Sequence, residues 1–221
     1  MSPRVRGVTE PRRIWLVRHG ETEGQSSIRF HGHNDVLLSD LGRAQIRALI
    51  PLFSGLPTVR VVHSPLQRAA ESAHVLVKAH GWDRARVAVD ERLREISFGL
   101  CEGLTAEEIA VAHPEFWAQH QRGEADAFPG GESRRLFGAR VAAAIHELCD
   151  RHASGDLVVV AHRGTVRHSL RTLLGVPATH EDPRKDLRVR LGSLSVLRDD
   201  DGPSGPPRDR RWHVELIDFV P

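Results

Sequence analysis

Residues 156–162, with the sequence DLVVVAH, decide the fold of this 221-residue chain. Five consecutive apolar residues stand between Asp156 and His162, with no polar residue at alternate positions. Such a run is typical of a strand that is buried on both faces, as in the centre of a parallel sheet. We therefore expect helices on both sides of this strand, and the polar side chain of His162 at its carboxyl end.

Strand and helix patterns alternate on both sides of this run. Ser39 or Asp40 is expected to cap the first helix, and Pro65 and Gly81 are expected to open and close the second. Alternating strands and helices predict a three-layer α/β/α sandwich with a mostly parallel central sheet. The hydrophobic patterns place further strands at residues 13–17, 59–64, 86–90, 193–198 and 211–219, and helices at 39–53, 65–81, 133–153 and 164–175.

A polar, loop-rich stretch at residues 93–133 interrupts this alternation. It contains two short helical patterns, at 105–113 and 114–121. We predict that residues 99–133 form a short helical lid, inserted into a single α/β domain that covers residues 13–221.

Two further segments lie outside these elements. Residues 1–12 are predicted to be a disordered lead-in, and the Gly-, Pro- and Asp-rich residues 199–210 a flexible loop.

Composition excludes several classes of protein. The 31 basic residues are nearly matched by 29 acidic ones, which argues against a nucleic-acid partner. No apolar run reaches the roughly 18–20 residues of a membrane span. Cys101 and Cys149 form no disulfide framework, and no secretory leader is visible, so we expect a cytoplasmic protein. The 14 histidines show no metal-ligand spacing, and the HGH at 31–33 is not assigned to a metal.

Polar side chains follow three of the predicted strands. Arg18 and His19 end the strand at 13–17, Arg68 comes shortly after the strand at 59–64, and His162 follows the central run. Ligands of α/β sheets bind beyond the carboxyl ends of the strands. If these strands are neighbours, one pocket contains two arginines and two histidines.

Such a pocket suits a phosphoryl group. Guanidinium groups match phosphate oxygens and stay charged at neutral pH. A neutral His19 could attack phosphorus, provided that an acceptor such as a backbone carbonyl fixes its other ring nitrogen. The leaving alkoxide needs a proton, and Glu95, flanked by Leu93 and Ile96, is the best candidate donor.

Several ordered motifs carry a resemblance to a known family. They are VRHGET at 17–22, HSPLQRA at 63–69, LREISFGLCEG at 93–103, PGGES at 129–133 and VVVAHRG at 158–164. Together they resemble the histidine phosphatase (phosphoglycerate mutase-like) superfamily over roughly Ile14 to Gly175. The resemblance implies that His19 is the phosphorylated nucleophile, and that Glu95 donates a proton and later activates water. It also implies that Arg18, Arg68 and His162 bind the phosphoryl group, and that no metal or other cofactor is needed.

The sequence departs from the family pattern at several positions. Where many members read ETxWN, residues 21–25 read ETEGQ, so either Gln25 or Ser26 would replace the asparagine that helps to hold phosphate. Arg163 separates His162 from the glycine that usually follows it, and either adds charge near the substrate or points to solvent. Residues Arg29 and Gly32 are also predicted to contact substrate, with a surface ion pair as the alternative for Arg29.

The lid distinguishes the enzymatic branches of the family. Family mutases carry a longer, more basic insertion, whereas residues 103–133 contain one arginine, Arg122. We therefore predict a metal-independent phosphomonoesterase of the histidine acid phosphatase type that acts on a small phosphorylated metabolite. The alternatives are a cofactor-dependent phosphoglycerate mutase and, from another class, a non-catalytic relative that binds a phosphorylated ligand. The sequence leaves open whether the chain forms a homodimer.

Overall fold

The computed structural model describes residues 12–56, 59–152, 155–176, 187–199 and 211–221. Most of the predicted lead-in and the loop at 200–210 lie outside these residues, while Arg12 and Asp199 belong to strands. The strands are β1 (Arg12–Arg18), β2 (Val59–His63), β3 (Val87–Val89), β4 (Asp156–Ala161), β5 (Leu194–Asp199) and β6 (Trp212–Phe219). The α-helices are α1 (Asp40–Leu49), α2 (Gln67–His80), α3 (Ala106–Ala112), α4 (Pro114–Gln121), α5 (Arg134–Arg151) and α6 (Arg163–Leu173), with short 3-10 turns at Ile50–Phe53, Arg84–Arg86, Glu91–Leu93 and Gly99–Cys101.

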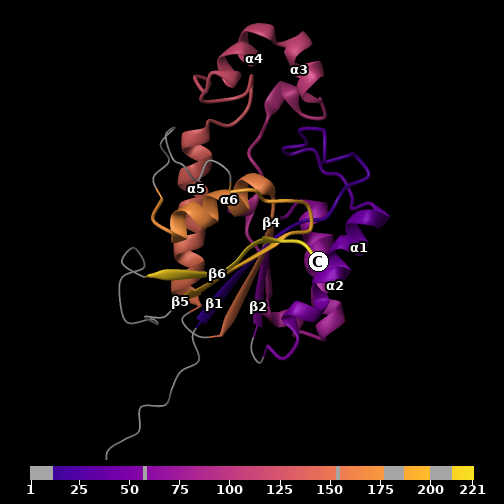
Figure 1. The fold of residues 1–221 in the computed structure, drawn as a ribbon, viewed down its shortest axis with the longest axis vertical. Coiled ribbons are helices and arrows are strands. Elements are labelled where there is room, and N and C mark those ends of the chain that lie inside the picture. Colours follow the sequence, from indigo (N-terminus) through magenta and orange to yellow (C-terminus); the bar gives the residue numbers. More distant parts are fainter. Residues whose placement is uncertain (1–11, 57–58, 153–154, 177–186, 200–210) are drawn as a thin grey trace, which may run out of the picture.

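The sheet has the strand order β3-β2-β4-β1-β5-β6. β3, β2, β4 and β1 are parallel, and β5 pairs antiparallel with both β1 and β6, so β5 alone of the described strands runs against the rest. Helices α1 and α2 cover one face and α5 and α6 the other (Figure 1). The predicted three-layer architecture with a mostly parallel sheet is confirmed.

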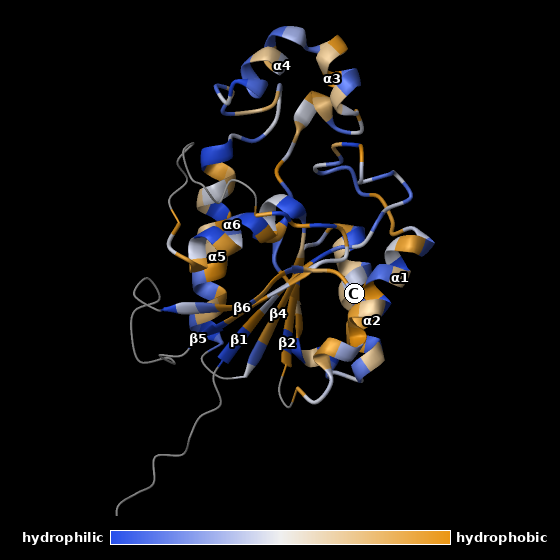
Figure 2. Cartoon of the chain, in the orientation of Figure 1, coloured by the Kyte–Doolittle hydropathy of each residue, from blue (hydrophilic) through white to orange (hydrophobic). Residues whose placement is uncertain are grey.

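The central strand β4 is buried along its whole length, as its sequence predicts. Val158 and Val160 pack on the side of α1 and α2, whereas Leu157, Val159 and Ala161 pack on the side of α5 and α6. Each face therefore has its own core, and the strands between them are strongly hydrophobic (Figure 2). Burial on this scale fixes the register of β4 against β1 and β2.

The helix boundaries differ from the prediction where proline intervenes. The first helix begins after Ser39, whose Oγ accepts from the Gly42 amide, but its α-helical part ends at Leu49. Pro51 lies in the 3-10 turn that follows, because proline has no amide to continue the α-helical pattern. Pro65 does not open α2, since Leu66 is extended and the helix starts at Gln67.

The insertion forms a small lid beyond the carboxyl ends of the strands, built on α3 and α4 (Figure 1). Thr105 and Glu108 form a capping box that starts α3. The lid has its own apolar cluster, made by Cys101, Ile109 and Phe128 with Phe30, Phe98, Leu104, Phe116 and Trp117. Within the described parts of the chain, no helix has the length and apolar character to cross a membrane.

Candidate active site

The two histidines of the predicted pocket stand side by side because β1 and β4 are adjacent. Arg18 pairs in register with Ala161, and the His19 amide donates to the Ala161 carbonyl at 3.0 Å. The next residue on each strand, His19 or His162, therefore leaves the sheet at the same point. Their ring centroids are 5.2 Å apart.

His19 is held in the form that a nucleophile requires. Its ring is buried, and Nδ1 lies 2.7 Å from the carbonyl oxygen of Gly20. Since a carbonyl only accepts, Nδ1 carries the proton and Nε2 keeps its lone pair. Burial, together with the charges of Arg68 and Arg18, holds the pKa of His19 well below its ordinary value of 6.5. The imidazole is therefore neutral at neutral pH.

Arg18 and Arg68 place two guanidinium groups in the same space. Arg18 donates to the Val189 carbonyl at 2.7 Å, and Arg68 donates to the carbonyls of Gly32 and Asn34 at 2.7 and 2.8 Å. Neither forms an ion pair with any carboxylate of the described residues. Burial lowers the pKa of each to about 10, so both remain cations at neutral pH. A buried cation, Arg68, and a half-buried one, Arg18, neither paired with a carboxylate of the described residues, create a strong preference for an anionic ligand.

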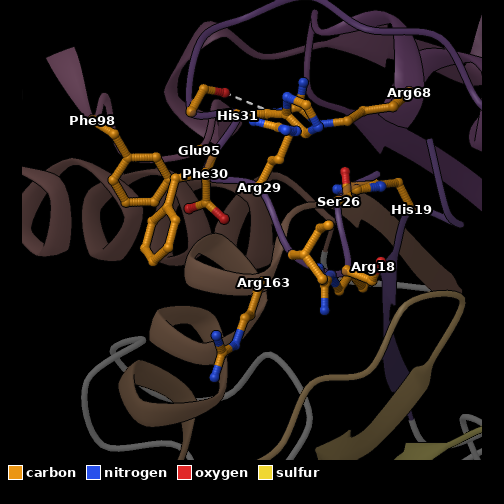
Figure 3. Close-up of a pocket in the computed structure, with 13 residues that line it drawn as sticks. Arg18, His19, Ser26, Arg29, Phe30, His31, Arg68, Glu95, Phe98 and Arg163 are labelled. Carbon is orange, nitrogen blue, oxygen red and sulfur yellow. Dashed lines mark hydrogen bonds between the residues drawn. The ribbon is translucent and has the colours of Figure 1, made fainter. Parts of the chain in front are cut away.

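Glu95 follows the 3-10 turn at Glu91–Leu93 and is almost fully buried. Its two carboxyl oxygens accept from the backbone amides of Ile96, at 3.0 Å, and Gly164, at 2.9 Å. A Cβ added at Gly164 would lie 2.3 Å from Glu95 Oε1, so only glycine permits this approach. In the view of Figure 3, Glu95 and His19 lie on opposite sides of the cavity.

These side chains border a cavity of about 140 Å³ at the carboxyl edge of the sheet (Figure 3). Of the predicted site residues, Arg18, His19, Ser26, Arg29, Gly32, Arg68, Glu95 and Arg163 line it, together with Ser27, Ile28, Phe30, His31 and Phe98. Segments that are far apart in the sequence therefore converge as expected.

His162 is not among the residues that line this cavity, and its contact with the phosphoryl group stays a prediction. It is completely buried behind the site, where its Nε2 lies 2.7 Å from the Ser64 hydroxyl. Its Nδ1 has no hydrogen-bond partner among the described residues. Burial and the charge of Arg68 also hold the pKa of His162 well below 6.5, so its ring is neutral.

Gln25 is absent from the cavity wall, and Ser26 takes its place. Gln25 has a φ of 59°, an unusual value for a residue with a side chain, and its side chain is exposed. Its carbonyl accepts from the amides of Ile28 and Arg29, which closes a tight turn. This turn faces Ser26 inward, with its Oγ 2.8 Å from the Thr22 hydroxyl.

The two remaining arginines differ in how freely they can meet a ligand. Arg29 donates to the Gly103 carbonyl at 2.7 Å and pairs with Glu108 at 2.8 Å, so it joins its loop to the lid. Arg163, the first residue of α6, is exposed at the rim of the cavity. It forms no hydrogen bond or ion pair within the described segments.

His31 is a site residue that the sequence interpretation missed. It is 7% exposed, lines the cavity, and has no hydrogen-bond partner for either ring nitrogen among the described residues. Burial lowers its pKa from 6.5, which favours a neutral ring. The HGH sequence at 31–33 points to this residue, but sequence reasoning interprets it only as a possible metal-binding pattern. No group of three or more His, Cys, Asp or Glu side chains in the described residues is arranged to hold a metal.

The fold and this pocket define an α/β protein with a cavity that brings two arginine cations together with a neutral imidazole and a carboxyl group. Comparison with known proteins agrees. The sequence model of the histidine phosphatase superfamily (branch 1) matches residues 14–204, and the chain belongs to this family.

Its relatives include enzymes that are named as phosphatases and as mutases. The glucosyl-3-phosphoglycerate phosphatase of Mycolicibacterium vanbaalenii is 35% identical over 93% of each chain. The probable phosphoglycerate mutase GpmB of Yersinia enterocolitica is 29% identical over 85% of this chain and 84% of its own. The structure of a mycobacterial glucosyl-3-phosphoglycerate phosphatase superposes with a TM-score of 0.80 at 28% identity, covering 95% of this chain and all of that one.

Proposed function

We propose that this protein is a metal-independent phosphomonoesterase of the histidine acid phosphatase type, which hydrolyses a small phosphorylated metabolite through a phosphohistidine. The observation that carries the proposal is the state of His19. Its ring is neutral and its Nδ1 is held by the Gly20 carbonyl, beside two guanidinium groups that pair with no carboxylate of the described residues.

In the first step, His19 Nε2 attacks phosphorus and the P–O bond to the leaving group breaks. Arg18 and Arg68 stabilise the charge that spreads over the equatorial oxygens. Glu95, carrying a proton, transfers it to the departing alkoxide and becomes a carboxylate.

In the second step, the Glu95 carboxylate takes a proton from a water molecule as that water attacks the phosphohistidine. The P–N bond breaks, inorganic phosphate forms, and His19 and Glu95 return to their starting states. Ser26 and Gly32 line the same cavity, which supports assigning them to contacts with the phosphoryl oxygens. Of the two ring nitrogens of His162, Nδ1 has no hydrogen-bond partner among the described residues, so we assign the predicted phosphoryl contact to this buried atom.

Hydrolysis is favoured over mutase chemistry by the charges around the lid. Arg122, the one arginine of residues 103–133, pairs with Glu124 at 2.8 Å and does not line the cavity. Arg29 is paired with Glu108. Among the described residues, Arg163 is then the one unpaired arginine that lines the cavity besides Arg18 and Arg68, so a bisphosphate, which a cofactor-dependent mutase must hold, would meet few available cations there.

The test compares phosphate release from a set of phosphorylated metabolites with interconversion of 2- and 3-phosphoglycerate, with and without 2,3-bisphosphoglycerate. We expect phosphate release that survives EDTA, a phosphoenzyme that is labile in acid, and loss of both in His19→Ala. Interconversion that depends on the bisphosphate would favour the mutase. Binding of phosphorylated ligands without turnover would favour the non-catalytic alternative.

A further inference from the structure

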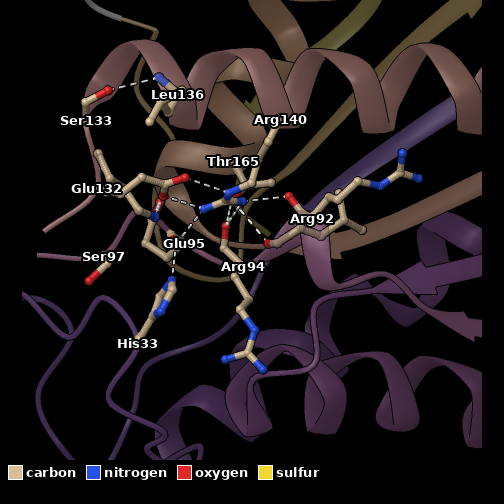
Figure 4. Close-up of polar contacts among 12 residues, drawn as sticks. His33, Arg92, Arg94, Glu95, Ser97, Glu132, Ser133, Leu136, Arg140 and Thr165 are labelled. Atoms are coloured by element: carbon tan, nitrogen blue, oxygen red, sulfur yellow. Dashed lines mark hydrogen bonds and ion pairs between the residues drawn. The ribbon is translucent and has the colours of Figure 1, made fainter.

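Arg140 of α5 contacts the backbone segment that carries Glu95, at residues 92–95 (Figure 4). One terminal nitrogen donates to the carbonyls of Arg92 and Arg94, at 2.7 and 3.0 Å. The other donates to the carbonyl of Glu95 itself, at 3.1 Å. A helix outside the cavity wall thus holds three carbonyls of the segment that delivers the proposed acid.

The same guanidinium also binds the end of the lid. Its Nε and one terminal nitrogen donate to the two carboxyl oxygens of Glu132, at 2.8 and 2.7 Å. Glu132 in turn donates from its backbone amide to the carbonyl of Ser97, at 3.0 Å. Arg140 therefore joins the segment entering the lid to the segment leaving it.

These contacts use the full capacity of the side chain. A guanidinium group has five N–H donors, and Arg140 makes five hydrogen bonds. Lysine could not reproduce this planar fork. With no donor left for a ligand, Arg140 acts through other residues.

The backbone around Glu95 depends on contacts with other elements for its position. Residues 94–98 have no helical or strand structure of their own. Thr165 donates to the carbonyls of Leu93 and Arg94, and His33 Nε2 lies 2.9 Å from the Glu95 carbonyl. The position of the carboxyl group is therefore set by side chains from other elements, and Arg140 provides the largest share of these contacts.

We propose that Arg140 is a positioning residue that holds the Glu95 carboxyl group in place for proton transfer and couples it to both ends of the lid. This inference rests on the proposed function, in which Glu95 is the acid. Displacing a catalytic group by about 1 Å can reduce the rate by about 10²-fold. Loss of the Arg140 hydrogen bonds is therefore expected to slow the step in which Glu95 protonates the leaving group.

The kinetic test uses Arg140→Met, with Arg135→Met as the matched control. Arg135 is exposed on the same helix and forms no hydrogen bond or ion pair with the described residues. We expect Arg140→Met to lower kcat/KM about 10- to 100-fold for phenyl phosphate, whose poor leaving group needs the acid. For 2,4-dinitrophenyl phosphate the loss is expected to stay below about threefold. Equal losses on the two substrates overturn the proposal.

A double-mutant cycle separates positioning from general support of the fold. Because Arg140 acts through Glu95, Arg140→Met should cost little in a Glu95→Gln background, so the two losses are not additive. Independent, multiplied losses contradict the inference. If Arg140→Met does not fold, Arg140→Lys gives the same comparison, because it keeps the charge and loses the fork.

Amide hydrogen exchange tests the clamp without any activity. The Ile96 and Gly164 amides donate to the Glu95 carboxyl oxygens, so their protection reports its position. In Arg140→Met we expect both to exchange at least about tenfold faster, with Val159 of β4 unchanged. Unchanged protection of both amides overturns the proposal. If the wild type releases no phosphate from any ester, the proposed function fails, and the exchange experiment still decides the role of Arg140.

Discussion

The Nδ1 of His19 lies 2.7 Å from the carbonyl oxygen of its own neighbour, Gly20, and this contact fixes the tautomer of the ring. Because burial keeps the pKa of His19 well below 6.5, the ring is expected not to titrate between about pH 7.5 and 6. Nitrogen NMR of labelled histidine, with the signal assigned by His19→Ala, should show protonated Nδ1 and bare Nε2 over this range. A titration midpoint near 6.5 would contradict this assignment.

The glycine after Arg163 is expected to be essential for the geometry of the acid. In Gly164→Ala the new methyl group would lie 2.3 Å from Glu95 Oε1, so the carboxyl group must move. We expect kcat/KM for phenyl phosphate to fall by about 10²-fold or more, as for loss of a general acid. Gly138→Ala is the control, because its methyl group meets only the His168 ring, at 3.3 Å. Similar activity in the two variants would refute the steric argument.

Inorganic phosphate should stabilise the protein through Arg68. A ligand at about 100 times its Kd adds about 2.7 kcal/mol to the free energy of unfolding. The melting temperature of the wild type and of Arg135→Met should therefore rise with phosphate, whereas that of Arg68→Met should not. A full shift in Arg68→Met would show that the anion binds elsewhere.

Arg163 is expected to contribute to recognition of the substrate beyond its phosphoryl group. An exposed ion pair contributes about 0.2–1 kcal/mol, so Arg163→Ala should raise KM for phosphomonoesters that carry a carboxylate up to about fivefold. The KM for 4-nitrophenyl phosphate should change less. An equal rise in both values would show that Arg163 acts on the shared phosphoryl group and serves no second anion, and no change in either value would support its orientation toward solvent.

The half-buried His168 predicts that the free energy of unfolding decreases in mild acid. Burial, with the charges of Arg171 and Arg167, lowers the pKa of His168 to about 4. Between about pH 6.5 and pH 4 the unfolded chain binds a proton there that the folded chain does not, so stability falls as pH falls, by up to about 1.4 kcal/mol per pH unit. Urea unfolding should show a shallower pH slope for His168→Gln than for the wild type.

The parts of the site that follow from strand order were predictable from the sequence. The apolar run of β4 and the shorter one before Arg18 identify neighbouring central strands, and residues after such strands meet at one edge. His19, Arg68 and Glu95 lie where the motifs place them. Their chemical roles stay predictions.

The parts that depend on irregular backbone were not predictable. The choice between Gln25 and Ser26 follows from a single positive φ, and the burial of His31 follows from a loop without hydrophobic periodicity. Arg140 gave no signal at all, because its partners are mostly backbone carbonyls more than 40 residues away in the sequence.

The tie between Glu132 and Ser97 limits how this scaffold can be modified for new substrates. The chain between these two residues contributes α3, α4 and most of the apolar cluster of the lid, whereas the proposed reacting groups project from the sheet edge and its adjoining turns. A graft that begins after Ser97 and ends before Glu132 replaces the lid as one unit and keeps both ends of this contact. A graft that also replaces Ser97 or Glu132 would loosen the backbone that positions Glu95, and would therefore change substrate selectivity and the rate of proton transfer together.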